Sequence, residues 1–245
     1  MERHFHHELE ALRDRLSEMA GRVETALVKS MEALKTRNPR LADEVRAEDI
    51  AIDRIEVEVE GRSLDFLGLQ QPVARDLRFL VAAIRISNDL ERIGDHAVNI
   101  AQSAIRLSAL PPSKPLEDIP VMADRTITML RDSVTAWVNG DADTARRICE
   151  RDVEIDGLKA KIFAKLSGGM IQSPESVPRG LELLLVSRNL ERVADLATNI
   201  AEEAIFVAEA RVIKHHAEDS TVHGRPGPGV PSAVAPPTSV KPSSR

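Results

Sequence analysis

The sequence predicts an all-α fold made of two tandem three-helix bundles that are related by internal duplication. Three observations support this prediction: apolar residues recur at helical spacing, prolines interrupt the pattern at intervals, and the second half of the chain repeats the first. Aromatic residues make up only 2% of the 245 residues. Since β-sheets favour aromatic and β-branched residues, this composition argues against sandwiches and barrels.

The first half of the chain contains three predicted helices. In the first of them the apolar residues are three or four positions apart, as in an amphipathic helix. These residues are Phe5, Leu9, Leu12, Leu16, Met19, Val23 and Ala26. The second helix is expected over about 39–69 and the third over about 72–107. Proline fits the first turn of a helix but not its interior, so Pro39 and Pro72 mark the joints.

Three further helices are predicted in the second half, over about 120–139, 141–168 and 175–213. Asn139-Gly140-Asp141 is typical of a helix end that is followed by an aspartate cap. Gly168-Gly169 and Ser173-Pro174 are expected to separate the last two helices. Short joints favour antiparallel neighbours, and hence bundles.

The domain organisation follows from these helices and from changes in composition. The predicted segments are a first bundle over 1–108, a Pro-rich linker over 109–119, a second bundle over 120–214 and a disordered tail over 215–245. The linker is assigned from a proline cluster that begins at Pro111. The tail is rich in Pro, Ser, Gly and Thr, and such a segment buries too little apolar surface to offset its ordering entropy.

Charge and cysteine content restrict the partners and the compartment. A net charge of −6 repels nucleic acid and anionic lipid, so neither is an expected ligand. The single Cys149 cannot form an internal disulfide. The N-terminal residues lack the apolar stretch of a signal peptide, and no apolar run approaches the roughly 20 residues that span a bilayer. We therefore expect a soluble, cytoplasmic protein.

The internal repeat is most evident in the third helix of each half. Leu90–Asp95 reads LERIGD, and Leu190–Asp195 reads LERVAD. The second helices agree as well, because Asp49–Asp53 (DIAID) matches Asp152–Asp156 (DVEID). A repeat of this length indicates two copies of one structural unit.

Each copy carries two pairs of carboxylates at the spacing i, i+4. The eight residues are Asp49, Asp53, Glu91 and Asp95 in the first copy and Asp152, Asp156, Glu191 and Asp195 in the second. Adjacent antiparallel helices can bring the two pairs of a copy together, and four converging carboxylates need a cation or protons between them. Oxygen donors suit Mg²⁺, Ca²⁺, Mn²⁺ or iron. The alternative is that each pair simply faces water, but its repetition in both halves favours metal binding.

The run Glu91–Ala97 (ERIGDHA), which is followed by Asn99-Ile100 and repeated from Glu191, resembles the signature of PhoU proteins, the regulators of bacterial phosphate uptake. The likeness covers about 1–215. It departs from the family pattern at Ala194, where glycine is usual, and at Leu196. The second copy of the site therefore matches the family pattern less closely than the first.

The resemblance implies two similar three-helix bundles and ligand roles for all eight carboxylates, in multinuclear clusters of iron or zinc. It also implies partners: the ATPase subunit of the phosphate ABC transporter, the sensor histidine kinase of the phosphate response, and a second copy of the chain in a homodimer. The expected location is near the inner face of the cytoplasmic membrane. The implied role is to restrain phosphate uptake and the starvation response when phosphate is plentiful.

Three functions remain open at this point. The favoured one is a non-enzymatic, metal-binding regulatory adaptor. A metal-dependent phosphohydrolase is the second, since clustered carboxylates support two-metal catalysis. Such an enzyme needs a general acid or base near the ions; only His96 is adjacent to the motif, and its counterpart is Leu196. We therefore assign no catalytic residue. The third is a purely structural helical scaffold.

Overall fold

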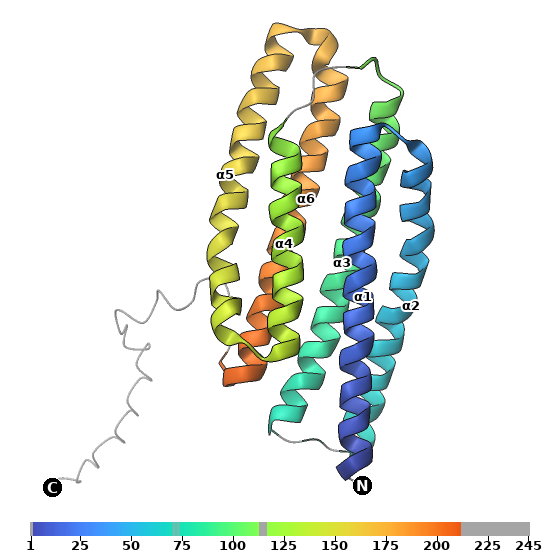
Figure 1. Cartoon of the computed structure of the whole chain (residues 1–245), viewed down its shortest axis with the longest axis vertical. Coiled ribbons are helices and arrows are strands. Elements are labelled where there is room, and N and C mark those ends of the chain that lie inside the picture. The colour runs from blue at the N-terminus through green and yellow to red at the C-terminus, as the bar shows by residue number, and fades with distance from the viewer. Residues whose placement is uncertain (1, 71, 73, 113–116, 212–245) are drawn as a thin grey trace, which may run out of the picture. The chain divides into compact units, whose positions relative to one another are not determined.

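The computed structural model describes residues 2–70, 72, 74–112 and 117–211. Within these residues the chain is helical and contains no strand, which confirms the all-α prediction (Figure 1). The helices are α1 (Glu2–Thr36), α2 (Pro39–Gln70), α3 (Ala74–Ser108), α4 (Asp118–Asn139), α5 (Ala142–Gln172), the short 3₁₀ helix η1 (Pro174–Ser176) and α6 (Val177–Glu209). The predicted tail over 215–245 lies outside the described residues.

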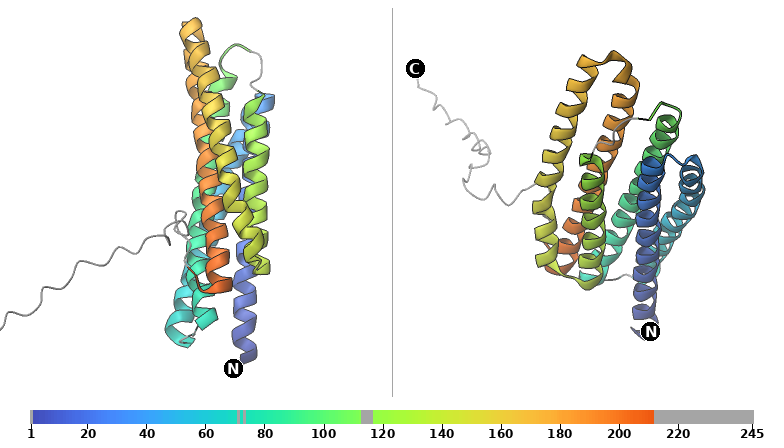
Figure 2. Two further views of the ribbon diagram at one scale, coloured as in Figure 1. Left: turned by 90° about the vertical axis from the view of Figure 1, so that its left-hand side faces the viewer. Right: turned by 45° about the horizontal axis from the view of Figure 1, so that its top comes forward.

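The helices are arranged as two three-helix bundles side by side, α1–α3 and α4–α6 (Figure 1). The bundles contact each other through α3 against α6 and α1 against α4. Figures 1 and 2 show α3 and α6 running in opposite directions. Trp137 of α4 stacks on Phe79 of α3 with ring centroids 5.5 Å apart, so the two bundles share one core.

One face of α3 is an apolar seam within the core that the two bundles share. Its residues are all buried: Ile86, Leu90, Ile93, Ala97, Ile100, Ala104 and Leu107. The helical spacing places them on one face of α3, and burial of each large aliphatic side chain contributes about 1.5–3 kcal/mol. The opposite edge of α3 is left for polar residues.

The helix joints follow the expected chemistry. Pro39 is the first residue of α2. Gly140 has φ 65°, a left-handed conformation that suits glycine, and Asp141 Oδ1 accepts a hydrogen bond from the Thr144 backbone N at 2.9 Å. These contacts confirm the stop and the cap predicted between α4 and α5.

The predicted ends differ from the structure in the second bundle. α5 continues through Gly168 and Gly169 and ends at Gln172. A glycine costs a helix only about 1 kcal/mol relative to alanine, whereas Pro174 lacks the N–H that a helix interior needs. α4 begins at Asp118, inside the predicted linker, and α6 ends at Glu209, before the predicted 213.

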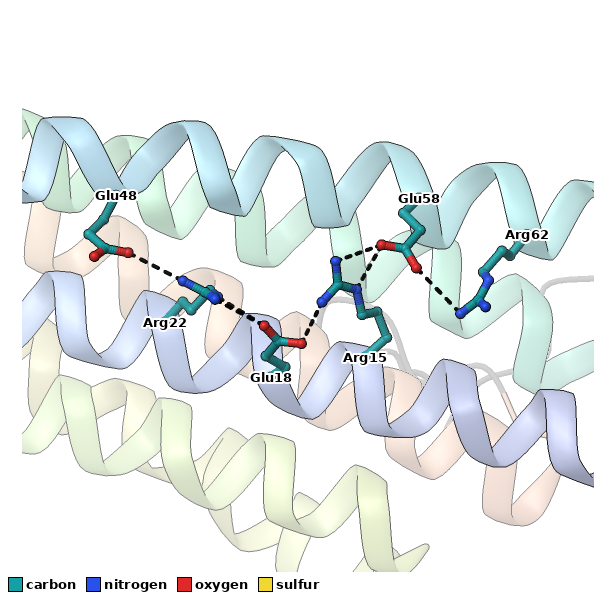
Figure 3. Close-up of polar contacts among 6 residues, drawn as sticks. All are labelled: Arg15, Glu18, Arg22, Glu48, Glu58 and Arg62. Carbon is teal, nitrogen blue, oxygen red and sulfur yellow. Dashed lines mark hydrogen bonds and ion pairs between the residues drawn. The ribbon is translucent and has the colours of Figure 1, made fainter.

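Ion pairs connect the outer faces of α1 and α2 in the first bundle. Figure 3 shows acidic and basic side chains alternating along the two helices. The chain of contacts runs through Glu48, Arg22, Glu18, Arg15, Glu58 and Arg62. The acids on this side of α2 are therefore matched by arginines. Exposed pairs of this kind each contribute at most about 1 kcal/mol.

No helix in the described part of the chain is both long enough and apolar enough to cross a membrane.

Candidate metal centre

The four carboxylates predicted for the first copy face each other across the contact between α2 and α3. Asp49 and Asp53 lie on α2, and Glu91 and Asp95 lie on α3. The pKa of Asp49 is raised to about 6, first by burial and then by the charges of Asp53 and Asp95. Such an effect requires the like charges to be close together. The structure therefore brings together the residues that the spacing predicted.

Glu56 is a fifth member of this group, which we call the first-copy cluster (Asp49, Asp53, Glu56, Glu91 and Asp95). The pKa of Glu91 is raised by burial first and then by the charges of Asp95, Asp53, Glu56 and Asp49. The pKa of Glu56 is itself raised, by burial first and then by the charges of Glu60 and Asp53, and the nearby Asn88 side chain opposes the increase. Sequence reasoning missed Glu56 because it searched for repeated pairs. Its position three residues after Asp53, on the same helix face, was the available signal.

The first-copy cluster has no basic partner among the residues that the structure describes. None of the ion pairs found there involves any of its five carboxylates. Arg92, which is adjacent to Glu91, instead lies 3.7 Å from Asp89. This side of α2 contrasts with the α1 side, where arginines match the acids (Figure 3). The cluster is therefore a concentration of negative charge without a counter-charge of its own.

Gly94 allows the close approach of α2 to α3 at the cluster. A Cβ at position 94 would stand 3.2 Å from Asp49 Oδ1 and 3.3 Å from Ile52 Cδ1. Glycine therefore leaves space for the Asp49 carboxylate against α3. In the second copy the equivalent residue is Ala194, which carries the Cβ.

The second-copy carboxylates are in a different electrostatic environment. Lys159 Nζ donates a hydrogen bond to Glu191 Oε1 at 2.8 Å. Arg192 contacts Asp195 Oδ2 at 3.1 Å, and its Nε lies 3.8 Å from Glu191 Oε2. The pKa of Asp195 is raised by burial and by Glu191, while Arg192 opposes the increase. Asp152 and Asp156 lie on α5, and the charge of Asp156 also raises the pKa of Asp195.

The donor chemistry fits a metal in the first copy better than in the second. As the side chains stand, no three Asp, Glu, His or Cys groups in the described part of the chain are gathered tightly enough to hold a metal ion. Five carboxylates without a cation nevertheless form a donor set that suits hard divalent ions. In the second copy a lysine already contacts a predicted ligand, and a cationic group is a poor neighbour for a metal.

His96 lies toward α6 rather than within the first-copy cluster. Its Nδ1 is 2.9 Å from Asn189 Oδ1, and Asn189 Nδ2 donates to the Leu185 carbonyl at 2.8 Å. The amide oxygen is therefore the acceptor and Nδ1 carries the proton. The groove around it has a volume of about 320 Å³ and is lined by His96, Asn99, Ser103, Arg106, Leu185, Arg188, Asn189 and Arg192.

Comparisons with known proteins agree with the duplicated architecture. The PhoU domain model matches the chain twice, over residues 16–104 and 119–204. The phosphate-specific transport system accessory protein PhoU homolog of Aquifex aeolicus is 38% identical over 208 residues, which are 85% of this chain and 94% of the relative. Homolog 2 of Thermotoga maritima is 33% identical over 205 residues, which are 84% of this chain and 87% of the relative.

Solved structures show the same fold. The crystal structure of PhoU from Pseudomonas aeruginosa superposes with a TM-score of 0.82 at 30% identity, and the match covers 84% of this chain and all of that one. PhoU from Streptococcus pneumoniae superposes with a TM-score of 0.79 at 27% identity, over 85% of this chain and 98% of that one. With two matched domains, two sets of duplicated carboxylates and this fold, the chain belongs to the PhoU family.

Proposed function

We propose that this chain is a non-enzymatic regulator of phosphate uptake and a negative regulator of the phosphate-starvation response. In this role it is a metal-binding adaptor between the phosphate ABC transporter and its sensor histidine kinase. The relatives described above are accessory proteins of a phosphate-specific transport system by name. That shared name and the family membership support a regulatory role.

The first-copy cluster is the observation that carries the metal part of the proposal. Its five carboxylates lie at the α2–α3 contact without a basic partner in the described part of the chain, so a cation would relieve their repulsion. Asp49, Asp53, Glu91 and Asp95 would hold it. The metal would supply positive charge that joins α2 to α3. Iron or zinc is proposed, and Mg²⁺, Mn²⁺ and Ca²⁺ also suit oxygen donors.

The position of His96 favours an adaptor over a phosphohydrolase. A hydrolase built on the cluster needs a general acid or base within hydrogen-bond reach of the reacting group. His96 is the histidine nearest to the motif, and its ring is bonded to Asn189 of α6. We therefore propose no catalytic residue in this chain.

An exposed apolar stripe on α2 supports binding to a protein partner. Ile50, Val57 and Leu64 are seven residues apart and are all more than half exposed. A heptad of this kind is the pattern with which one helix packs on another. We propose the transporter ATPase, the kinase or a second copy of this chain as partners. The proposed location is cytoplasmic, at the inner face of the membrane.

The test is a deletion in the host with complementation. Loss of the protein should raise phosphate-starvation gene expression in phosphate-rich medium, and the wild-type gene should restore repression. The triple variant Ile50→Ser, Val57→Ser and Leu64→Ser should fail to co-purify the ATPase or the kinase, while Val28→Ser with Val121→Ser, at exposed apolar positions on other helices, should retain them. A deletion strain with normal repression would contradict the regulatory role.

The same protein preparation distinguishes an adaptor from an enzyme. Purified protein with added metal should hydrolyse a phosphate monoester no faster than buffer with the same metal. Turnover above that background that disappears in Asp95→Ala would establish the phosphohydrolase instead.

A further inference from the structure

Positions 56 and 159 are equivalent in the two copies but carry opposite charges. Asp53 matches Asp156 in the repeat, and three residues later the first copy has Glu56 where the second has Lys159. Both residues are half-buried. They lie on equivalent helices, α2 and α5, and on the helix face that carries the carboxylates. This one position of the repeat therefore makes the charges of the two clusters differ by two units.

In the second copy the Lys159 ammonium takes a place among the acids. Its Nζ lies 2.8 Å from Glu191 Oε1, and the Glu191 side chain is only 13% exposed. The Lys159 side chain is 40% exposed, so the pair is partly buried and is screened by salt somewhat less than a fully exposed pair. A metal that used Glu191 would have to displace the lysine or bind beside it.

A second difference concerns the arginine of the LER motif. In the first copy Arg92 pairs with Asp89, at 3.7 Å, and so points away from the cluster. In the second copy the residue equivalent to Asp89 is the neutral Asn189, whose amide is bonded to His96 and to the Leu185 carbonyl. Arg192 instead contacts Asp195, at 3.1 Å. Two cations therefore accompany the second-copy carboxylates, and none accompanies those of the first copy among the described residues.

We infer that position 159 determines which copy takes a metal: Lys159 and Arg192 neutralise the second-copy carboxylates within the chain, and the first-copy cluster, extended by Glu56, is the metal site. Asp152, Asp156, Glu191 and Asp195 then form a salt-bridge cluster instead of a second metal centre. Glu56 is an additional ligand or a neighbour that strengthens cation binding. Ala194, with its Cβ at the place where Gly94 leaves space, agrees with this division. The inference rests on the proposed metal binding.

Electrostatics gives the reason for the division. A divalent ion close to an ammonium and a guanidinium is repelled by both, and removal of the lysine from its carboxylate costs the ion pair that it makes there. In the first copy the same ion relieves repulsion and displaces no cation that belongs to the described residues. The two sites thus differ in how strongly their charges attract a divalent ion, and in whether an ion pair must be broken to bind it.

The experiment measures metal content in charge-swapped variants of the full chain. The protein is stripped with a chelator, loaded with Fe²⁺ or Zn²⁺ alone, desalted and analysed by mass spectrometry of the elements. Glu91→Gln with Asp95→Asn should lose the metal, and Glu191→Gln with Asp195→Asn should retain all of it. Glu56→Lys should lose the metal, whereas Lys159→Glu should about double it. Asp65→Lys and Lys35→Glu make the same charge changes at exposed sites and should have no effect.

Two outcomes overturn the inference. The first is a loss of metal in the Glu191→Gln, Asp195→Asn variant. The second is unchanged metal content in both Glu56→Lys and Lys159→Glu. If the wild type retains no metal at all, the metal part of the proposed function fails. The role of position 159 is then tested by thermal unfolding in the presence of chelator. Glu56→Lys should then raise the melting temperature and Lys159→Gln should lower it, each by a few degrees; shifts of the opposite sign would refute the neutralising role of Lys159.

Discussion

Asp49 of α2 lies directly against Gly94 of α3, so closely that a Cβ on residue 94 would stand 3.2 Å from Asp49 Oδ1. This distance is tighter than most real Cβ contacts, and the same Cβ would also stand 3.3 Å from Ile52 Cδ1. The absence of a side chain at residue 94 therefore lets the Asp49 carboxylate of α2 lie against the backbone of α3.

Replacement of Gly94 by alanine should weaken metal binding more than it weakens the fold. Alanine favours a helix over glycine by about 1 kcal/mol, which offsets the cost of moving Asp49. The displaced carboxylate should reduce metal content, measured as above, while the melting temperature changes little. Gly61→Ala is the control, because the space around Gly61 is open. Gly61→Ala should stabilise the protein and leave its metal content intact, and full metal content in Gly94→Ala would contradict the assignment of Asp49.

The metal-free protein should become less stable as the pH rises from about 4 to 6. The pKa of Asp49 is about 6 in the folded protein, against an ordinary value of 3.8. Between these values the folded state binds the proton more tightly than the unfolded state, so unfolding releases it and stability falls with rising pH. Burial also raises the pKa of Glu91, which acts in the same direction.

This pH dependence is measured as the melting temperature in chelator at several pH values. Asp49→Asn should reduce the slope, and added divalent metal should reverse the loss at pH 7. Asp65→Asn, at an exposed position on the same helix, serves as the control. A slope in Asp49→Asn that equals that of the wild type would mean that Asp49 titrates normally.

Arg37 should be required for the end of α3. Its Nη2 donates to the carbonyls of Leu107 and Ser108, each at 3.0 Å, and also to that of Leu110. These carbonyls lie at the negative end of the helix dipole, so the guanidinium both bonds and neutralises them. Arg37→Ala should lower the free energy of unfolding by about 1–3 kcal/mol.

Chemical denaturation followed by circular dichroism checks this cost. Arg37→Lys should recover part of it, because an ammonium keeps the charge but not the planar geometry and reach of the guanidinium. Arg40→Ala, exposed and one turn away, should change stability by less than about 0.5 kcal/mol. An Arg37→Ala variant as stable as Arg40→Ala would show that Arg37 does not stabilise the C-terminal end of α3.

The stacking of Phe79 on Trp137 should stabilise the packing of the first bundle against the second. Both rings are about 95% buried. Phe79→Ala leaves a cavity between α3 and α4 and should cost about 3–5 kcal/mol. Since Trp137 is the only tryptophan, its fluorescence during urea unfolding reports on this contact. Phe163→Ala, at a 60% exposed position, should have little effect. Equal midpoints for the two variants would show that the stack contributes nothing.

Much of the fold was predictable because it depends on local periodicity. The apolar seam of α3 and the Gly140-Asp141 joint each follow from residues a few positions apart. The convergence of Asp49 and Asp53 with Glu91 and Asp95 also followed, since an i, i+4 spacing fixes the helix face and a short joint fixes the neighbour.

The remaining features depend on contacts between distant residues. Lys159 contacts Glu191 across the contact between α5 and α6. The repeat could not indicate this ion pair, because the two copies differ at the position of Lys159. His96 turns to Asn189, which is 93 residues away. The helical path through Gly168-Gly169 differs from the prediction for another reason: the propensity cost of glycine is too small to end α5, which continues to Gln172, shortly before Pro174.

The cation at the second copy has one further consequence, because it is part of the polypeptide. No chelator can extract the Lys159 ammonium, and its local concentration does not depend on what the cell imports. The α5–α6 pair therefore keeps its counter-charge during metal starvation, whereas the five acids between α2 and α3 contain none of their own. With the proposed metal in the first copy, the contact between α2 and α3 would depend on metal supply, whereas the ion pair between α5 and α6 would not.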